Sequence, residues 1–273
     1  MQRTFETPGA ISLYVELGAG NLRVSAEPVA ETTVTVDGRD ADEATVERRG
    51  DEVVVLAPHR KAGFFSPSSE LRVSVVLPTD SELATKLGSA DLVAQGRYAT
   101  SRIRSGSGDL RIDELAAEAV VETGSGDVAI DAAHGDLRVK CGSGDVAIRQ
   151  LGKSVVISTG SGDVTLGTAE HDVVVKSGSG DVEVKRVQDD LSVSTASGSL
   201  AVGTILRGTV KARVVSGDVR IGIPAGVPVW TDVSSVSGRV SSTLESAGRP
   251  EEGQDYVEIR ATTVSGDIHL EQR

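Results

Sequence analysis

The 273 residues include 31 glycines but only three Phe, three Tyr and one Trp, so an apolar core has to be built from aliphatic side chains. A formal net charge of −12 argues against nucleic acid as a partner. No apolar run is long enough to span a bilayer, and one cysteine gives no disulfide framework. The first ten residues lack the basic start and apolar core of a secretory signal, which predicts a cytoplasmic protein.

Residues 1–80 are rich in β-strand signals but irregular, and no stretch has the periodicity of an amphipathic helix. Apolar runs and β-branched residues predict strands at 11–17, 22–24, 32–36, 53–56 and 71–77. Polar or Gly- and Pro-rich stretches predict exposed loops at 37–43, 58–70 and 245–255.

From residue 88 onward a short glycine turn recurs every 18 residues, which is the signature of a stacked repeat. Five copies have the form (S/T/C)GSGD and begin at Ser105, Thr123, Cys141, Thr159 and Ser177. A sixth copy at 195–199 has lost its acid, and looser copies end at Asp218, Arg239 and Asp267. Because each unit is too short to bury its own apolar face, the units have to stack on one another.

Two strands per repeat are indicated by apolar residues that alternate at period two. One set includes Leu110 and Ile112, and the other Ala119 and Val121, each with equivalents in the following repeats. A further apolar row begins at Leu115 and suggests a short third edge. An antiparallel meander would have similar turns in both halves, whereas only one half here has the glycine turn. The sequence therefore predicts an all-β, single-stranded parallel β-solenoid with 18-residue coils and irregular β caps, wound right-handed as parallel crossovers usually are.

The expected organisation is one continuous structural unit in three parts. Residues 1–80 form a β-rich N-terminal cap, residues 81–222 the regular solenoid, and residues 223–273 the irregular C-terminal coils and cap. Solenoid ends need covers because open strand edges invite aggregation, and Trp230 is a candidate for one cover. We expect a monomer or a small homo-oligomer, because Arg239, Ser241 and the acidic pair at 251–252 oppose stacking at the C-terminal end.

The turn supplies the conspicuous polar and glycine rows. The structural turn row consists of Asp109, Asp127, Asp145, Asp163 and Asp181 with Gly108, Gly126, Gly144, Gly162 and Gly180. The glycines permit a positive φ or a close approach of the neighbouring coil. Each Asp is expected to accept hydrogen bonds from backbone N–H groups of its own turn. The hydroxyls that precede the glycines are expected to bond along their row, with Cys141 as a small buried spacer.

The repeated TGSGD-V-x-I unit, the opening segment 5–20 and the segment 71–80 resemble the bacterial β-strand-repeat "putative adhesin" family, a domain of unknown function. The resemblance covers almost the whole chain. It implies a β-solenoid related to the heads of some surface adhesins, and it carries over no catalytic residue. A surface location is implied by this resemblance alone.

The favoured function is a non-enzymatic scaffold or interaction module without cofactors, catalytic residues or metal ligands. One alternative is a calcium-binding repeat protein, although calcium rolls need carboxylates and carbonyls from both half-turns. A third is a polysaccharide-acting β-helix enzyme, although the four His residues are scattered and the regular faces have no aromatic platform. The predicted partner is an unknown protein or a second copy. Its expected contact is the basic and aromatic loop with Arg60, Lys61, Phe64 and Phe65.

Overall fold

The computed structural model describes residues 1–58, 70–245 and 255–273. The chain divides into two compact units, Met1–Asp136 and Leu137–Arg273. Each unit consists of two long sheets, and the described residues contain 27 strands and one short 3-10 helix, η1 (Ala41–Glu43). No helix among these residues is long and apolar enough to cross a membrane.

The first sheet of the N-terminal unit has seven strands. In spatial order they are β1 (Gln2–Glu6), β4 (Glu31–Asp37), β7 (Leu71–Pro78), β3 (Gly20–Glu27), β9 (Asp91–Tyr98), β11 (Leu110–Leu115) and β13 (Val128–Ala133). Its second sheet has six strands. They are β5 (Thr45–Arg49), β6 (Glu52–Leu56), β2 (Ser12–Leu17), β8 (Glu82–Leu87), β10 (Ser101–Ser105) and β12 (Ala119–Thr123). All five strands expected in residues 1–80 are present, and β1 and β5 are additional.

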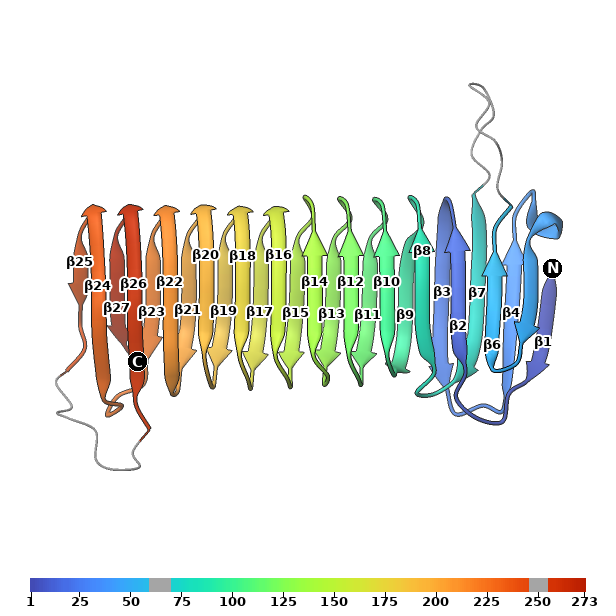
Figure 1. The fold of residues 1–273 in the computed structure, drawn as a ribbon, viewed down its shortest axis with the longest axis horizontal. Coiled ribbons are helices and arrows are strands. Elements are labelled where there is room, and N and C mark those ends of the chain that lie inside the picture. The colour runs from blue at the N-terminus through green and yellow to red at the C-terminus, as the bar shows by residue number, and fades with distance from the viewer. Residues whose placement is uncertain (59–69, 246–254) are drawn as a thin grey trace, which may run out of the picture. The chain divides into compact units, whose positions relative to one another are not determined.

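The C-terminal unit repeats the same arrangement with seven strands in each sheet (Figure 1). One sheet contains β15 (Val146–Leu151), β17 (Val164–Ala169), β19 (Val182–Val187), β21 (Leu200–Ile205), β23 (Val219–Ile223), β27 (Ile268–Gln272) and β25 (Val240–Ser242). The other contains β14 (Leu137–Cys141), β16 (Val155–Ser161), β18 (Val173–Ser179), β20 (Leu191–Ser197), β22 (Gly208–Ser216), β26 (Val257–Ser265) and β24 (Val229–Ser237).

Parallel pairing between equivalent residues of successive repeats confirms the all-β, solenoid-like character of the chain. Leu110 of β11 lies opposite Val128 of β13, and Val155 of β16 opposite Val173 of β18. The alternating apolar residues of these strands are buried and form the core. The third apolar row, which begins at Leu115, is also buried. It does not form a separate third edge, since Leu115 is the last residue of β11. The pairing of β11 with β13 omits Asp113 and resumes at Glu114.

Spatial order departs from chain order at two places. In the N-terminal unit, β2 lies between β6 and β8, and β3 between β7 and β9. In the C-terminal unit, β26 and β27 enter between earlier strands, so that β24 and β25 become the outermost strands of their sheets (Figure 1). The last strands in the sequence are therefore internal strands of the fold.

Candidate interaction surface

The glycine corner of the repeat changes composition in the last coils of the C-terminal unit. Its first glycine, as at Gly178, is replaced by Ala196 in the next repeat and by valine in the three repeats after that. These valines are Val215 in β22, Val264 in β26 and Val236 in β24. The residues on both sides of each valine are paired from strand to strand, so the three valines form one row, which we call the valine corner.

The valine corner faces outward. Val215 and Val264 expose 52% and 50% of their surface, and Val236 exposes 82%. Neighbouring strands lie about 4.8 Å apart, so the three side chains are close enough to form a continuous apolar ridge. Single exposed valines are ordinary, whereas contiguous exposed apolar groups mark contact sites. The sequence reasoning missed this row, although the replacement of one turn position by valine in three repeats was a readable signal.

Aromatic side chains lie toward the other end of the same strands. Trp230 of β24 pairs in register with Glu258 of β26, and the guanidinium of Arg260 lies 5.8 Å from the centre of its indole ring. Arg260 Nε in turn donates a hydrogen bond to Glu258 Oε1 at 2.7 Å. Trp230 is 52% exposed on the outward side of β24, so it does not cover the end of the core as expected.

The exposed large apolar residues of the described chain are concentrated in these coils. There are six such residues, Val215, Trp230, Val236, Val240, Tyr256 and Val264. Five of them lie on or beside β22, β26 and β24, and we call the outward surface of these three strands the C-terminal face. Tyr256 borders a hollow of about 230 Å³, whose other lining residues are Asp189, Arg207, Gly208, Thr209 and Asp255.

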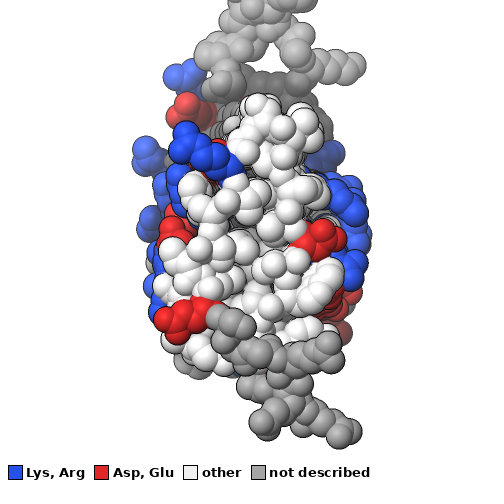
Figure 2. All heavy atoms as spheres, turned by 90° about the vertical axis from the view of Figure 1, so that its left-hand side faces the viewer, with Lys and Arg blue, Asp and Glu red and all other residues white. Residues whose placement is uncertain are grey.

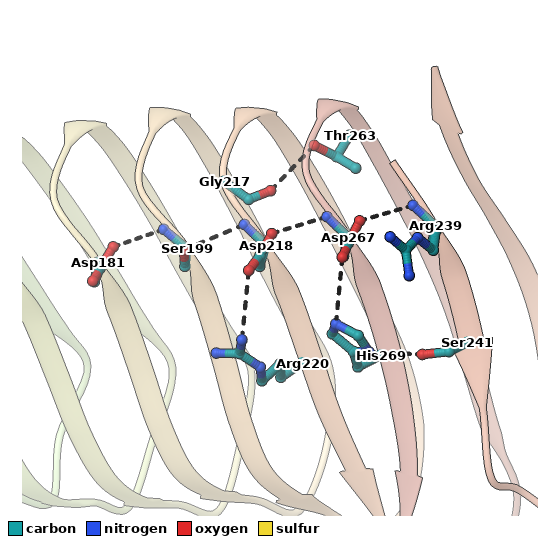
Figure 3. A network of polar contacts seen from close by, with 10 residues as sticks. All are labelled: Asp181, Ser199, Gly217, Asp218, Arg220, Arg239, Ser241, Thr263, Asp267 and His269. Atoms are coloured by element: carbon teal, nitrogen blue, oxygen red, sulfur yellow. Dashed lines mark hydrogen bonds and ion pairs between the residues drawn. The ribbon is translucent and has the colours of Figure 1, made fainter. Parts of the chain in front are cut away.

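The Asp row beside this surface connects coils, which corrects the expectation that each carboxylate bonds within its own turn. Asp163 Oδ1 accepts the backbone N–H of Asp181 at 2.8 Å, and Asp181 Oδ1 accepts that of Ser199 at 2.7 Å. In the last coils Asp218 accepts the N–H of Asp267, and Asp267 accepts that of Arg239 (Figure 3). Asp109, Asp127 and Asp145 belong to the same pattern, since Asp109 accepts from Asp127 and Asp145 from Asp163.

The hydroxyl row behaves in the opposite way, because its members bond within their own turns. Gly126 N donates to Thr123 Oγ1, and Gly108 N donates to Ser105 Oγ, each at 3.2 Å. The buried Cys141 occupies the same place, with its Sγ 3.1 Å from Gly144 N. The sequence suggested that Asp bonds within its own turn and that the hydroxyls bond from coil to coil, and the structure shows the reverse. The longer Asp side chain reaches the next coil, whereas the shorter hydroxyl does not.

The other glycines of the turn are required by the close approach of coils. A Cβ on Gly108 would lie 1.9 Å from the carbonyl oxygen of Ala90, and one on Gly126 2.0 Å from that of Gly108. At Gly162 and Gly180 the corresponding distances are 2.3 and 2.2 Å, and φ is positive as well. The close approach therefore occurs at all four of these glycines, and a positive φ is present in addition at Gly162 and Gly180.

One polar cluster has the residue types of a catalytic triad. Ser241 Oγ lies 2.6 Å from His269 Nδ1, and His269 Nε2 lies 4.0 Å from Asp267 Oδ2 (Figure 3). A separation of 4.0 Å is too long for a hydrogen bond, so Asp267 does not orient the imidazole as a triad requires.

The predicted contact residues Arg60, Lys61, Phe64 and Phe65 lie outside the described residues.

The stacked parallel coils define a β-solenoid-like repeat module, and its last coils carry an exposed apolar surface. The Toastrack DUF4097 family model matches residues 10–172 and 153–271, so the chain belongs to this family, as its repeats indicated. No curated protein matches the chain by sequence.

Three solved structures illustrate what this chain is similar to. A "putative lipid binding protein" from Parabacteroides distasonis is 14% identical with a TM-score of 0.45, and the match covers 100% of this chain and 96% of that one. A "putative adhesin" from Parabacteroides merdae is 13% identical with a TM-score of 0.41, covering 100% and 95%. A "putative adhesin" from Bacteroides fragilis is 11% identical with a TM-score of 0.33, covering 100% and 96%.

Proposed function

We propose that this protein is a non-enzymatic, adhesin-like scaffold that binds a protein partner through the C-terminal face. The observation that carries the proposal is the valine corner, where three repeats replace a turn glycine with an exposed valine. Valines at this corner contribute nothing to the core, so their recurrence needs a reason outside the fold. Pairing in register with β26 keeps the three valines at the same corner. The regular coils are 18 residues long and wound right-handed in this proposal.

The chemistry of the face fits recognition of a protein. Aromatic residues and arginine are enriched where proteins meet, and Trp230, Tyr256 and Arg260 lie at one end of the face with the valine corner at the other. Trp230 and Val236 are six positions apart on β24, or about 20 Å along a strand. The face could therefore receive a partner segment laid along the strand direction.

The proposal is tested by site-specific photo-crosslinking in the cell of origin. Ser234 lies between Trp230 and Val236 on the same strand and is exposed, so a photo-reactive residue there samples the face. We expect discrete adducts from this position and none from Ser158, on the regular surface of β16. The triple variant V215S/V236S/V264S should abolish the adducts while the melting temperature changes little, because all three side chains are exposed.

A matched control removes valines from the regular surface. Val156 and Val174 are paired neighbours on β16 and β18 and face outward, half-buried. The variant V156S/V174S should leave the Ser234 adducts intact. Adducts that persist in the triple valine variant, or that form equally at Ser158, would show that the C-terminal face is not the binding surface.

A further inference from the structure

The outermost coil of the C-terminal unit leaves two strand edges without a partner among the described residues. β24 and β25 are the last strands of their sheets, and each is paired on one side only, with β26 and β27. The two edges run in opposite directions (Figure 1). An unpaired edge presents a row of N–H and C=O groups that can hydrogen-bond to another strand.

The side chains of these edges do not protect them. Among the nine residues of β24 only Asp232 is charged, and β25 has no charged residue. The edge strand β5 of the N-terminal unit differs, since three of its five residues are Glu47, Arg48 and Arg49. Charged residues are the usual means of preventing edge-to-edge pairing. Figure 2 shows the outer surface of this coil, where a largely uncharged centre is bordered by scattered charged groups.

The interior of this coil is also incompletely covered. The residues of β24 that point toward the core are Val229, Thr231, Val233 and Ser235, which pair with the buried Val257, Ile259, Ala261 and Thr263. Those four residues of β24 are themselves half-buried or exposed. In the other sheet Val240 is 46% exposed, whereas its neighbour Ile268 is fully buried. The core-side residues of the outermost coil are therefore left partly uncovered in both sheets.

We propose that a second copy of this chain covers the coil formed by β24 and β25, related to the first by a two-fold axis. A partner that satisfies both edges must present two antiparallel edges at the spacing of the two sheets. The outermost coil of a second copy has the same distance between its two sheets, because it is the same structure. A two-fold rotation brings these equivalent surfaces together. A chain with a net charge of −12 repels its own copies, so an uncharged surface is where two copies can approach.

The Asp row forms a ladder of hydrogen bonds from coil to coil, which we call the Asp ladder. The end of this ladder argues against continued stacking in the same direction. Each acid accepts the N–H of the following coil, but the outermost coil has Arg239 at this position and offers no carboxylate. A further coil added in register would leave its own N–H without that acceptor. The contact is therefore expected to close as a dimer. It uses the edges of β24 and β25 and does not depend on the proposed function of the outward face.

The test is sedimentation of the full chain over a range of micromolar concentrations, with Thr231→Lys and Thr262→Lys as a matched pair. Thr231 is exposed at the outer coil and points to the side that the second copy covers, whereas Thr262 is exposed on the outward side of β26. We expect the wild-type chain to dimerise, Thr231→Lys to weaken dimerisation by at least ~tenfold, and Thr262→Lys to leave it unchanged.

A second variant and a second measurement guard against misfolding of Thr231→Lys. Val240→Lys places the charge on the other edge and should weaken the dimer in the same way. Amide hydrogen exchange in β24 should slow as the wild-type concentration rises, because the free N–H groups become bonded. A wild-type chain that stays monomeric, a dimer that survives both Lys variants, or open-ended polymers would each overturn the proposal.

Discussion

At the scale of single residues, the same pentapeptide adopts two corner geometries. TGSGD occurs at 123–127 in the N-terminal unit and at 159–163 in the C-terminal unit. In the first copy the strand ends at Thr123 and Gly126 N bonds to its hydroxyl, whereas in the second β16 continues to Ser161 and Gly162 N bonds to Ser179 O. The bonding partner of this glycine therefore comes from its own turn in the first copy and from the neighbouring coil in the second.

Substitution of Gly162 should be costly for this reason. Its φ of +128° is unfavourable for other residues, and a Cβ would lie 2.3 Å from Gly144 O. We expect Gly162→Val to destabilise the fold by about 1–3 kcal/mol or more. Ala147→Thr, on the exposed side of β15 opposite Thr165, should be nearly neutral. Denaturant unfolding compares the two, and equal losses would contradict the close packing of coils at this corner.

Tyr98 is a buried phenol that should make stability depend on alkaline pH. Its single hydroxyl hydrogen is shared between Val24 O at 2.8 Å and Gln95 O at 2.9 Å. Burial, and secondarily the charge of Asp113, raise the pKa of Tyr98 far above its ordinary value of 10.0. The neutral phenol is therefore favoured in the folded state, so this contribution is complete below pH 10 and is lost as the unfolded chain ionises above it.

We expect the free energy of unfolding of the wild-type protein to fall above about pH 10 more steeply than that of Tyr98→Phe. At neutral pH the same substitution should cost about 1–3 kcal/mol, since it removes the hydroxyl that donates to the carbonyl of the buried Val24. Denaturant unfolding at a series of pH values measures both effects. Parallel pH profiles of the two proteins would show that Tyr98 ionises equally in both states.

At the scale of the strands, the Asp ladder ties each glycine corner to the next. Asp145, Asp163 and Asp181 each use one carboxylate oxygen to accept the N–H of the following coil. This arrangement also brings carboxylates together at the coil spacing of about 4.8 Å, where they repel one another. The ladder therefore needs an acceptor oxygen at each position more than it needs a charge.

Two substitutions at Asp163 separate the acceptor from the charge. Asp163→Asn keeps an oxygen for the N–H of Asp181 and removes a repelling charge, so it should change stability by less than about 0.5 kcal/mol. Asp163→Ala removes the acceptor and should cost about 1–2 kcal/mol. Urea unfolding of both variants measures the difference. A result in which Asn is as harmful as Ala would assign the stabilisation to the charge.

At the scale of the whole molecule, equivalent coils should be interchangeable. Deletion of residues 155–172 joins Ser154 to Val173, which normally pairs with Val155, so the register of all following strands is kept. Because solenoid stability is roughly a sum over neighbouring repeats, we expect a folded protein with a smaller denaturant m-value. Circular dichroism and urea unfolding test this.

The control is a deletion of half a coil. Removing residues 155–163 joins Ser154 to Val164, which belongs to the opposite sheet of the unit, and every later strand would then have to change sheets. This variant should not fold cooperatively. If both deletions were equally tolerated, pairing in register between repeats would not determine the fold.

The recurring TGSGD turn and the alternating Val and Ile residues were sufficient to predict parallel stacking, the core rows and the family. The reason is that a repeat brings each residue beside its own equivalent, as Val155 lies beside Val173, so local pattern and long-range contact carry the same information. The glycine row could be predicted for the same reason, because each turn has to pass close to a copy of itself.

Only the tertiary structure decided where the irregular segments are placed. The pairing of Ser12 with Glu82 and of Val210 with Ile259 joins segments that share no exact repeat spacing, so nothing local specifies them. These insertions make β24 and β25 the outermost strands, and they place Val236 beside Val264 rather than beside Val215. The order of coils, and with it the candidate contact surface, depends on competition between strand edges that are distant in the sequence.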